Sequence, residues 1–80
     1  MNKYTILPKD NCVGMDLMIP ENRYAKILCH VTSDEGLHSI LYIEREYIML
    51  TKTGKVFNWN PLPVPDELMP LAMSCAEHYI

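Results

Sequence analysis

The sequence predicts a single small α+β domain, in which an antiparallel β-meander carries a C-terminal helix on one face. Two observations lead to this prediction: four β-rich runs separated by short turns, and a final segment with apolar residues at helical spacing. Consecutive strands followed by a helix are typical of two-layer α+β domains. The predicted parts are an N-terminal strand and irregular cover (1–22), the meander (23–59), a Pro-rich linker (60–65) and the helix (66–80).

The N-terminal segment is predicted to add an edge strand and a cover. Residues 3–7 alternate in character, with Tyr4 and Ile6 on one side, which is typical of a short strand. Residues 12–20 are apolar but have no period, so we expect them to lie irregularly over part of the second sheet face, the one opposite the predicted helix. With this strand the sheet would have four or five strands, and five would allow it to curl towards a small barrel.

The first hairpin determines the predicted register of the sheet. Its two runs are joined by a segment that ends in Gly36, which suits a three-residue loop with glycine in the left-handed region. This loop pairs Thr32 with His38 and Cys29 with Leu41. Because side chains alternate along a strand, one face of the sheet then carries Ala25, Ile27, Cys29, Val31, Ser39, Leu41 and Ile43.

The next two turns extend this face into the last two predicted strands. A tight turn within 44–46 would pair Tyr42 with Tyr47, although a two-residue primed turn without glycine is strained. Gly54 marks the last hairpin, where a loop of two residues or of three would place the following strand on opposite faces. The two-residue loop is favoured because it completes one apolar face with Ile48, Leu50, Phe57 and Trp59.

The C-terminal segment is predicted to form the helix that covers this face. Asp66 and Glu67 place negative charge at its start, where the helix dipole favours it. Pro70 is tolerated within the first turn. Three alternating prolines before Asp66 predict a stiff, extended linker. The stripe expected to pack on the Ile27 face consists of Leu68, Leu71, Ala72, Cys75, Ala76 and Tyr79.

The opposite face of the sheet is the predicted binding site, because no second helix is available to cover it. An exposed apolar patch of several hundred Å² usually marks an interaction surface, and tyrosine and methionine suit such surfaces. Two neighbouring histidines there would make association sensitive to pH. The predicted partner-binding face consists of Tyr24, Leu28, His30, His38, Ile40, Tyr42, Tyr47 and Met49.

Composition and charge narrow the classes of partner and compartment. The formal net charge is −3 and the seven basic residues are dispersed, which argues against nucleic acid as the main partner. Three cysteines form an odd set that is unlike a secreted disulfide framework, so we expect a cytoplasmic location. The sequence has neither an apolar run long enough to span a bilayer nor a signal-peptide pattern, so no membrane partner is expected.

The sequence contains few residues in patterns that carry chemistry. Cys75 and His78 have C-x-x-H spacing, but zinc needs four convergent ligands. Cys29 and His30 are adjacent on a predicted strand and point to opposite faces, so they cannot both bind one ion. No nucleophile elbow or Gly-rich phosphate loop is present. We therefore predict no catalytic residue, no metal and no cofactor.

The sequence therefore favours a small, non-catalytic, cytosolic interaction or regulatory module. It would act as an adaptor or an inhibitor by binding another protein, or a second copy of itself as a homodimer, through the Tyr/Met-rich face. One alternative is a single-stranded nucleic-acid binder that stacks bases on the same tyrosines. Another is a small metal-binding protein or Cys/His enzyme built on Cys75 and His78.

Overall fold

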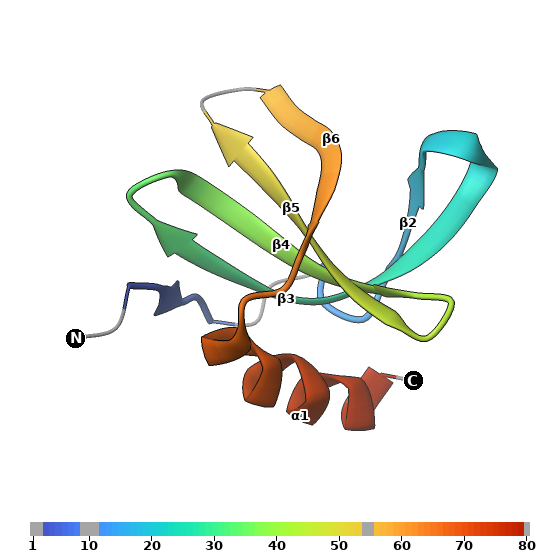
Figure 1. The fold of residues 1–80 in the computed structure, drawn as a ribbon. Helices are drawn as coiled ribbons and strands as arrows, with labels where there is room; N and C mark the ends of the chain where they lie inside the picture. Colours follow the sequence, from blue (N-terminus) through green and yellow to red (C-terminus); the bar gives the residue numbers. More distant parts are fainter. Residues whose placement is uncertain (1–2, 9–11, 54–55, 80) are drawn as a thin grey trace.

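The structure is an α+β fold in which one antiparallel sheet carries a single C-terminal helix. The computed structural model describes residues 3–8, 12–53 and 56–79, and the side chains of residues 20, 53 and 56–61 are not described. In this part of the chain six strands form one sheet that does not close into a barrel, as Figure 1 shows. The strands are β1 (Thr5–Ile6), β2 (Asp16–Ile19), β3 (Arg23–Ser33), β4 (Gly36–Ile43), β5 (Glu46–Thr53) and β6 (Val56–Pro63).

The long strand β3 organises the N-terminal side of the sheet. Its first half pairs with β2 and its second half with β1, while β4, β5 and β6 follow on its other side. The predicted edge strand at 3–7 is confirmed in a shorter form as β1. The prediction of an irregular cover at 12–20 is wrong for residues 16–19, which form β2 and pair with β3. Ile27 donates its N–H to Met15 and accepts one from Gly14, which extends the ladder beyond β2.

The predicted register of the first hairpin is wrong. Ser33 pairs with Gly36, so the loop has two residues rather than three. The backbone N–H of Glu35 donates to the Ser33 hydroxyl, a local bond that supports the tighter turn. A second shift follows at Leu28, where a β-bulge inserts one extra residue into β3.

The bulge divides β3 between the two faces of the sheet. Ile27 lies on its predicted face. Cys29 and Val31 lie on the opposite face, and His30 lies on the Ile27 face, where Cys29 and Val31 were predicted. The next turn is confirmed as a tight one that pairs Tyr42 with Tyr47. The assignments of β4 and β5 to the two faces were therefore correct, while half of β3 was assigned to the wrong face.

The last hairpin extends further along the chain than predicted. Thr53 pairs with Val56, and pairing resumes at Met49 with Leu62 after a second irregularity. The strand therefore runs to Pro63, and the predicted linker at 60–65 is mostly strand. Prolines are tolerated there because β6 is an edge strand. The predicted positions of the Phe57 and Trp59 side chains fall outside the described residues.

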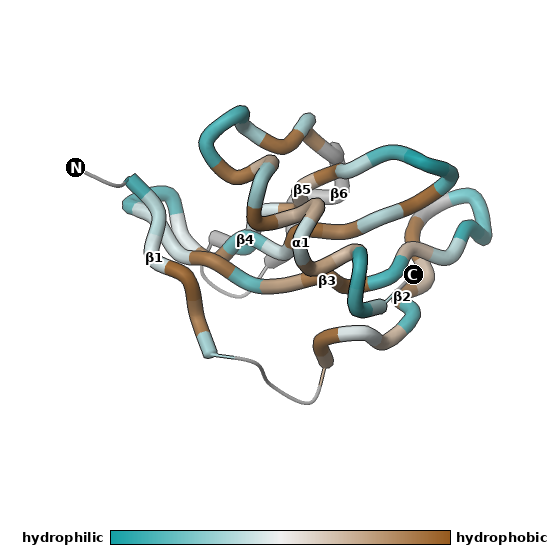
Figure 2. The backbone as a smooth tube through the Cα atoms, turned by 90° about the horizontal axis from the view of Figure 1, so that it is seen from below, coloured by the Kyte–Doolittle hydropathy of each residue, from teal (hydrophilic) through white to brown (hydrophobic). Residues whose placement is uncertain are grey.

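The helix forms where predicted but packs on the other face of the sheet. A short 3-10 turn (η2, Asp66–Leu68) leads into α1 (Met69–Tyr79), which lies across the middle of the sheet between β1 and β2 (Figure 2). Ala72 and Ala76 are buried against the sheet, and their small size permits a close approach. The sheet residues beneath the helix include Leu28, Cys29, Val31, Ile40 and Met49, whereas the predicted contact was the Ile27 face.

The Ile27 face is buried by the sheet itself. Figure 1 shows the sheet curling away from α1, with β2 and β6 at its two ends. The short helical turn η1 (Pro20–Asn22) connects β2 to β3 at one of these ends. The second core lies within the described part of this curl and consists of Ile19, Ala25, Ile27, Leu41, Ile43 and Leu50, with Leu17 and Ile48 packed against it. Curling thus covers the face that the helix was expected to cover.

Candidate binding groove

Half of the predicted partner-binding face is core, because Leu28, His38, Ile40 and Met49 are buried. Leu28 and Ile40 are 0% exposed and Met49 is 5% exposed, because α1 packs on them. The expectation that this face is uncovered is therefore wrong. Four predicted residues keep accessible surface: His30 is half-buried, Tyr42 and Tyr47 are half-buried at the edge of the helix, and Tyr24 is exposed opposite Met18 of β2.

The two histidines of the predicted face are separated by the sheet. His38 is on the helix side and is completely buried. His30 lies on the other side, because the two-residue turn pairs it with Ser39, and its Nδ1 is hydrogen-bonded to the Ser39 hydroxyl at 3.0 Å. The proposed pair that would titrate together is not formed. The prediction that Cys29 and His30 point to opposite faces is confirmed, since Cys29 belongs to the helix-side core.

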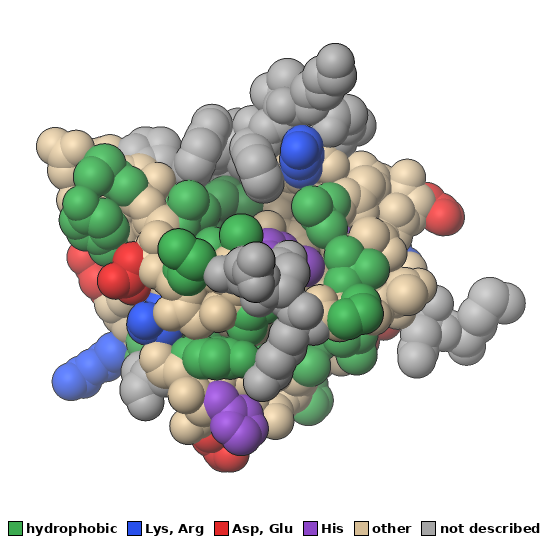
Figure 3. Space-filling view, turned by 180° about the vertical axis from the view of Figure 1, so that it is seen from behind, with side chains coloured by type: hydrophobic (Ala, Val, Ile, Leu, Met, Phe, Trp, Pro, Cys, Tyr) green, Lys and Arg blue, Asp and Glu red, His purple; other side chains and the backbone are tan. Residues whose placement is uncertain are grey.

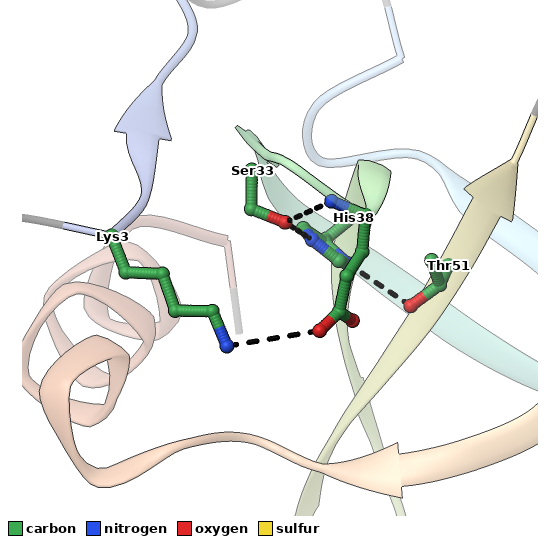
Figure 4. Close-up of polar contacts among 5 residues, drawn as sticks. Lys3, Ser33, His38 and Thr51 are labelled. Carbon is green, nitrogen blue, oxygen red and sulfur yellow. Dashed lines mark hydrogen bonds and ion pairs between the residues drawn. The ribbon is translucent and has the colours of Figure 1, made fainter.

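His38 is the centre of a polar cluster that sequence analysis missed. Its Nε2 is hydrogen-bonded to the Ser33 hydroxyl and its Nδ1 to the Thr51 hydroxyl at 3.0 Å (Figure 4). The Tyr4 ring meets the imidazole edge-on, with ring centroids 5.5 Å apart. Burial lowers the pKa of His38, so the ring is held neutral. No sequence signal beyond β-strand alternation joins these residues, which come from β1's flank, β3, β4 and β5.

The Ser33–His38 contact resembles a nucleophile and its base but has a structural explanation. A catalytic base must reach a proton on substrate, and the His38 ring has no exposed surface. The Ser33 hydroxyl is also occupied by the Glu35 N–H. The ion pair between Lys3 and Glu35, with 3.8 Å between nitrogen and oxygen, lies beside the same turn (Figure 4). The cluster therefore satisfies buried polar groups where β1 meets the hairpin.

Cys29 and Cys75 meet between the sheet and the helix. Burial and a hydrogen bond with Cys75 raise the pKa of the Cys29 thiol to about 12. A small cavity of about 170 Å³ lies beside the two thiols, with mostly apolar walls. Within the described part of the chain, His, Cys, Asp and Glu side chains form no group of three that could bind a metal. The two cysteines pack against the helix-side core as small apolar groups.

An open groove follows the seam between α1 and the β4–β5 hairpin. The rings of Tyr42 and Tyr47 pack edge to face across the two strands, with centroids 5.1 Å apart and planes at 63°. From the helix, Met73 and Glu77 form the facing wall because residues four apart lie on one side of a helix. Ala76 forms the floor. This part of the groove has a volume of about 310 Å³.

The groove continues past Tyr47 towards β6. A second part of about 540 Å³ shares the Tyr47 side chain and is bordered by both the sheet and the start of the helix. Leu62 and Met73, one in each part, are 47% and 53% exposed. We call the two parts together the seam groove. Its second part is lined by Glu46, Tyr47, Ile48, Leu62, Pro63, Val64 and Met69.

The lining of the seam groove is apolar and acidic. Its described charged residues are Glu46 and Glu77, and neither forms an ion pair with a described Lys or Arg side chain. Lys26 is paired with Tyr42 in the register, but its amine donates to the Gly14 carbonyl at 2.9 Å and lies 3.5 Å from Asp16. The groove therefore combines half-buried tyrosine and exposed thioether surface with two carboxylates that are in no ion pair with a described Lys or Arg side chain.

Exposed apolar side chains also occur outside the seam groove. Ile6, Met15, Met18 and Tyr24 are all exposed. On the side seen in Figure 3, hydrophobic side chains are spread over the described surface and charged ones lie mostly near its rim. Among the described residues no helix is long and apolar enough to cross a membrane. The seam groove differs from these scattered residues because it is concave and joins two elements.

Comparisons with protein-family models, with curated proteins and with solved structures give no match.

Proposed function

We propose that this chain is a small, non-catalytic interaction module that binds a segment of another protein in the seam groove. The observation that carries the proposal is the pair of shallow hollows that both border Tyr47, with the half-exposed apolar side chains of Met73 and Leu62 in their lining. A concave apolar surface bordered by tyrosine and methionine offers contact area and a shape that can adapt to a partner. An adaptor or inhibitor would act in this way, by binding alone.

The non-catalytic part of the proposal is supported by how the polar groups are used. His38, Ser33 and Thr51 satisfy one another inside the fold. Burial raises the pKa of the Cys29 thiol, and Cys29 and Cys75 pack between the sheet and the helix. These candidates for chemistry are therefore explained by packing. We also propose a cytoplasmic location, which suits three cysteines that are not joined in a disulfide.

Two other occupants of the seam groove are weaker candidates. A second copy of the chain would bury the same tyrosines in a homodimer. A measurement of the solution mass distinguishes this homodimer from a complex with another protein. Single-stranded nucleic acid could stack on Tyr42 and Tyr47, but phosphate groups would be repelled by Glu46 and Glu77. A protein segment satisfies both the apolar walls and the negative charge.

The test is to identify the occupant by cross-linking from inside the groove. A photoreactive benzoylphenylalanine replaces Met73, and a control carries it at Met18, which is 50% exposed on β2. The protein captured from Met73 is then purified and titrated with the wild-type chain. We expect Met73→Asp to weaken binding about tenfold or more, because it introduces charge into an apolar contact. Met18→Asp should leave it unchanged.

Three outcomes would contradict the proposal. If Met18→Asp weakens binding and Met73→Asp does not, the interaction surface lies on β2. If the captured species is the chain itself, sedimentation equilibrium at about 1–100 µM should show a dimer, and the occupant is a second copy. Equal affinity of both variants for the purified partner would remove the seam groove from the interaction.

A further inference from the structure

The tyrosine pair of the seam groove is suited to binding a cation. Tyr42 and Tyr47 are held in register by the tight β4–β5 turn. Both side chains line the same part of the groove as Glu77. Aromatic rings attract a cation placed within about 6 Å of the ring centre, through the negative charge of the ring faces. The two rings are fixed by strand pairing and by their own edge-to-face contact, so little ordering is required on binding.

The groove carries two carboxylates that form no ion pair with the described Lys and Arg side chains. Glu77 is exposed on α1 at the groove wall, and Glu46 precedes Tyr47 on β5. The basic side chains Lys3, Arg23 and Lys26 are committed to other carboxylates. The chain as a whole has a net charge of −3. A partner group of positive charge is therefore favoured at this position over a neutral or negative one.

We propose that the Tyr42/Tyr47/Glu77 part of the seam groove binds an arginine side chain of the partner. This inference rests on the proposed function and names the chemistry of the residue that docks. A guanidinium is planar, weakly hydrated and able to stack on a tyrosine ring while it donates to a carboxylate. Met73 and Ala76 contact its aliphatic stem, which has the apolar character that these side chains match.

The test uses nuclear magnetic resonance with two probes that differ only in charge. N-acetyl-arginine methylamide and N-acetyl-citrulline methylamide are titrated separately into the ¹⁵N-labelled chain, up to about 50 mM because a single side chain binds weakly. We expect saturable shifts at Tyr42, Tyr47, Met73 and Glu77 with arginine, and an affinity for citrulline at least about fivefold weaker. Added salt should weaken the arginine response.

Matched variants assign the effect to the proposed residues. Glu77→Gln should reduce the affinity for arginine to about that for citrulline, since the change removes the charge and keeps the shape. Glu67→Gln changes an exposed carboxylate outside the groove lining and should have no effect. Tyr47→Leu should weaken the arginine response while it keeps an apolar side chain at that position. The unchanged remainder of the spectrum verifies that each variant is folded.

The outcomes separate this inference from the proposed function. Equal responses to arginine and citrulline, shifts located elsewhere, or no response to arginine would overturn the cation site. The proposed function would still stand if the purified partner loses binding on Met73→Asp. If Met73→Asp leaves the affinity for the partner unchanged, the proposed function is contradicted, and so is the arginine inference that rests on it.

Discussion

At the scale of single residues, His38 combines complete burial with hydrogen bonds at both ring nitrogens. Burial is the main cause that lowers its pKa from the ordinary 6.5, while Glu35 raises the pKa and Lys3 lowers it. Because the pKa of His38 is lower in the folded state, the folded protein binds fewer protons than the unfolded chain when the pH is below about 6.5. Stability from His38 is therefore fully present above about pH 6.5 and is lost as the pH falls below it.

The expected result is a lower free energy of unfolding at about pH 5 than at about pH 7.5, measured by urea denaturation. In His38→Gln most of this difference should disappear, whatever the variant costs in absolute stability. His78→Gln, at an exposed position of α1, should keep the wild-type dependence on pH. An unchanged pH dependence in His38→Gln would show that other groups are responsible.

Cys29 provides a second prediction at this scale. A thiol whose pKa is raised from 9.0 to about 12 has a thiolate fraction roughly a thousandfold smaller at pH 8. We expect iodoacetamide to label the exposed Cys12 readily and Cys29 only after denaturant is added. Mass spectrometry of peptides after a time course gives both rates in one sample. Labelling of Cys29 as fast as Cys12 would contradict its burial beneath α1.

At the scale of elements, the β4–β5 hairpin contains local strain. Glu44 and Arg45 have φ values of 49° and 68°, the left-handed conformation required by a two-residue primed turn, and neither is glycine. The strain is retained because this turn is what pairs Tyr42 with Tyr47 and so shapes the seam groove. The exposed Arg23–Glu44 ion pair, at 3.5 Å, contributes little against it.

Arg45→Gly should therefore raise the free energy of unfolding by about 0.5–1 kcal/mol. Glycine removes the steric penalty at this φ but adds conformational entropy to the unfolded chain, so the gain is smaller than the full penalty. Arg45→Ala is the control, because alanine keeps the Cβ and should give no gain. Urea denaturation of the two variants measures the difference. A loss of stability in Arg45→Gly would mean that the Arg45 side chain contributes more than its exposed position indicates.

At the scale of the whole molecule, the fold depends on α1 closing the helix-side face of the sheet. Ala72 has no exposed surface and lies in the same core as Leu28, Ile40 and Met49. The other face is closed by curling and has its own core. A domain of this size has a total stability of about 5–10 kcal/mol, so the loss of one of two cores is enough to unfold it.

Ala72→Asp should lower the free energy of unfolding by roughly 3–5 kcal/mol, because it buries a carboxylate without a partner. Ser74→Asp introduces the same side chain two residues away on the exposed side of the helix. That control should change stability by only about 0.5 kcal/mol. Thermal unfolding followed by circular dichroism compares the two. Similar melting temperatures would show that α1 does not pack through Ala72.

Several features of the fold could be predicted from local sequence. The apolar stripe from Leu68 to Ala76, with acidic residues before it and Pro70 in its first turn, was sufficient to predict the helix. Alternation along β4 and β5 separated Leu41 and Ile43 from Ile40 and Tyr42 correctly. These signals are local, since periodicity and capping depend on residues a few positions apart.

The register and the choice of face were decided only in the tertiary structure. The two-residue turn after Ser33 moved Cys29, His30 and Val31 to the faces opposite those predicted, and the bulge at Leu28 returned Ile27 to its predicted face. No local pattern marks either feature. Both sheet faces are apolar, so the sequence did not indicate which one the helix would cover. The curl of the sheet buries the Ile27 face, which leaves the tyrosine face for α1 and places the seam groove along the edge of the helix. Which apolar face is buried by which element depends on long-range packing, and that is why the tertiary structure was needed to locate the candidate site.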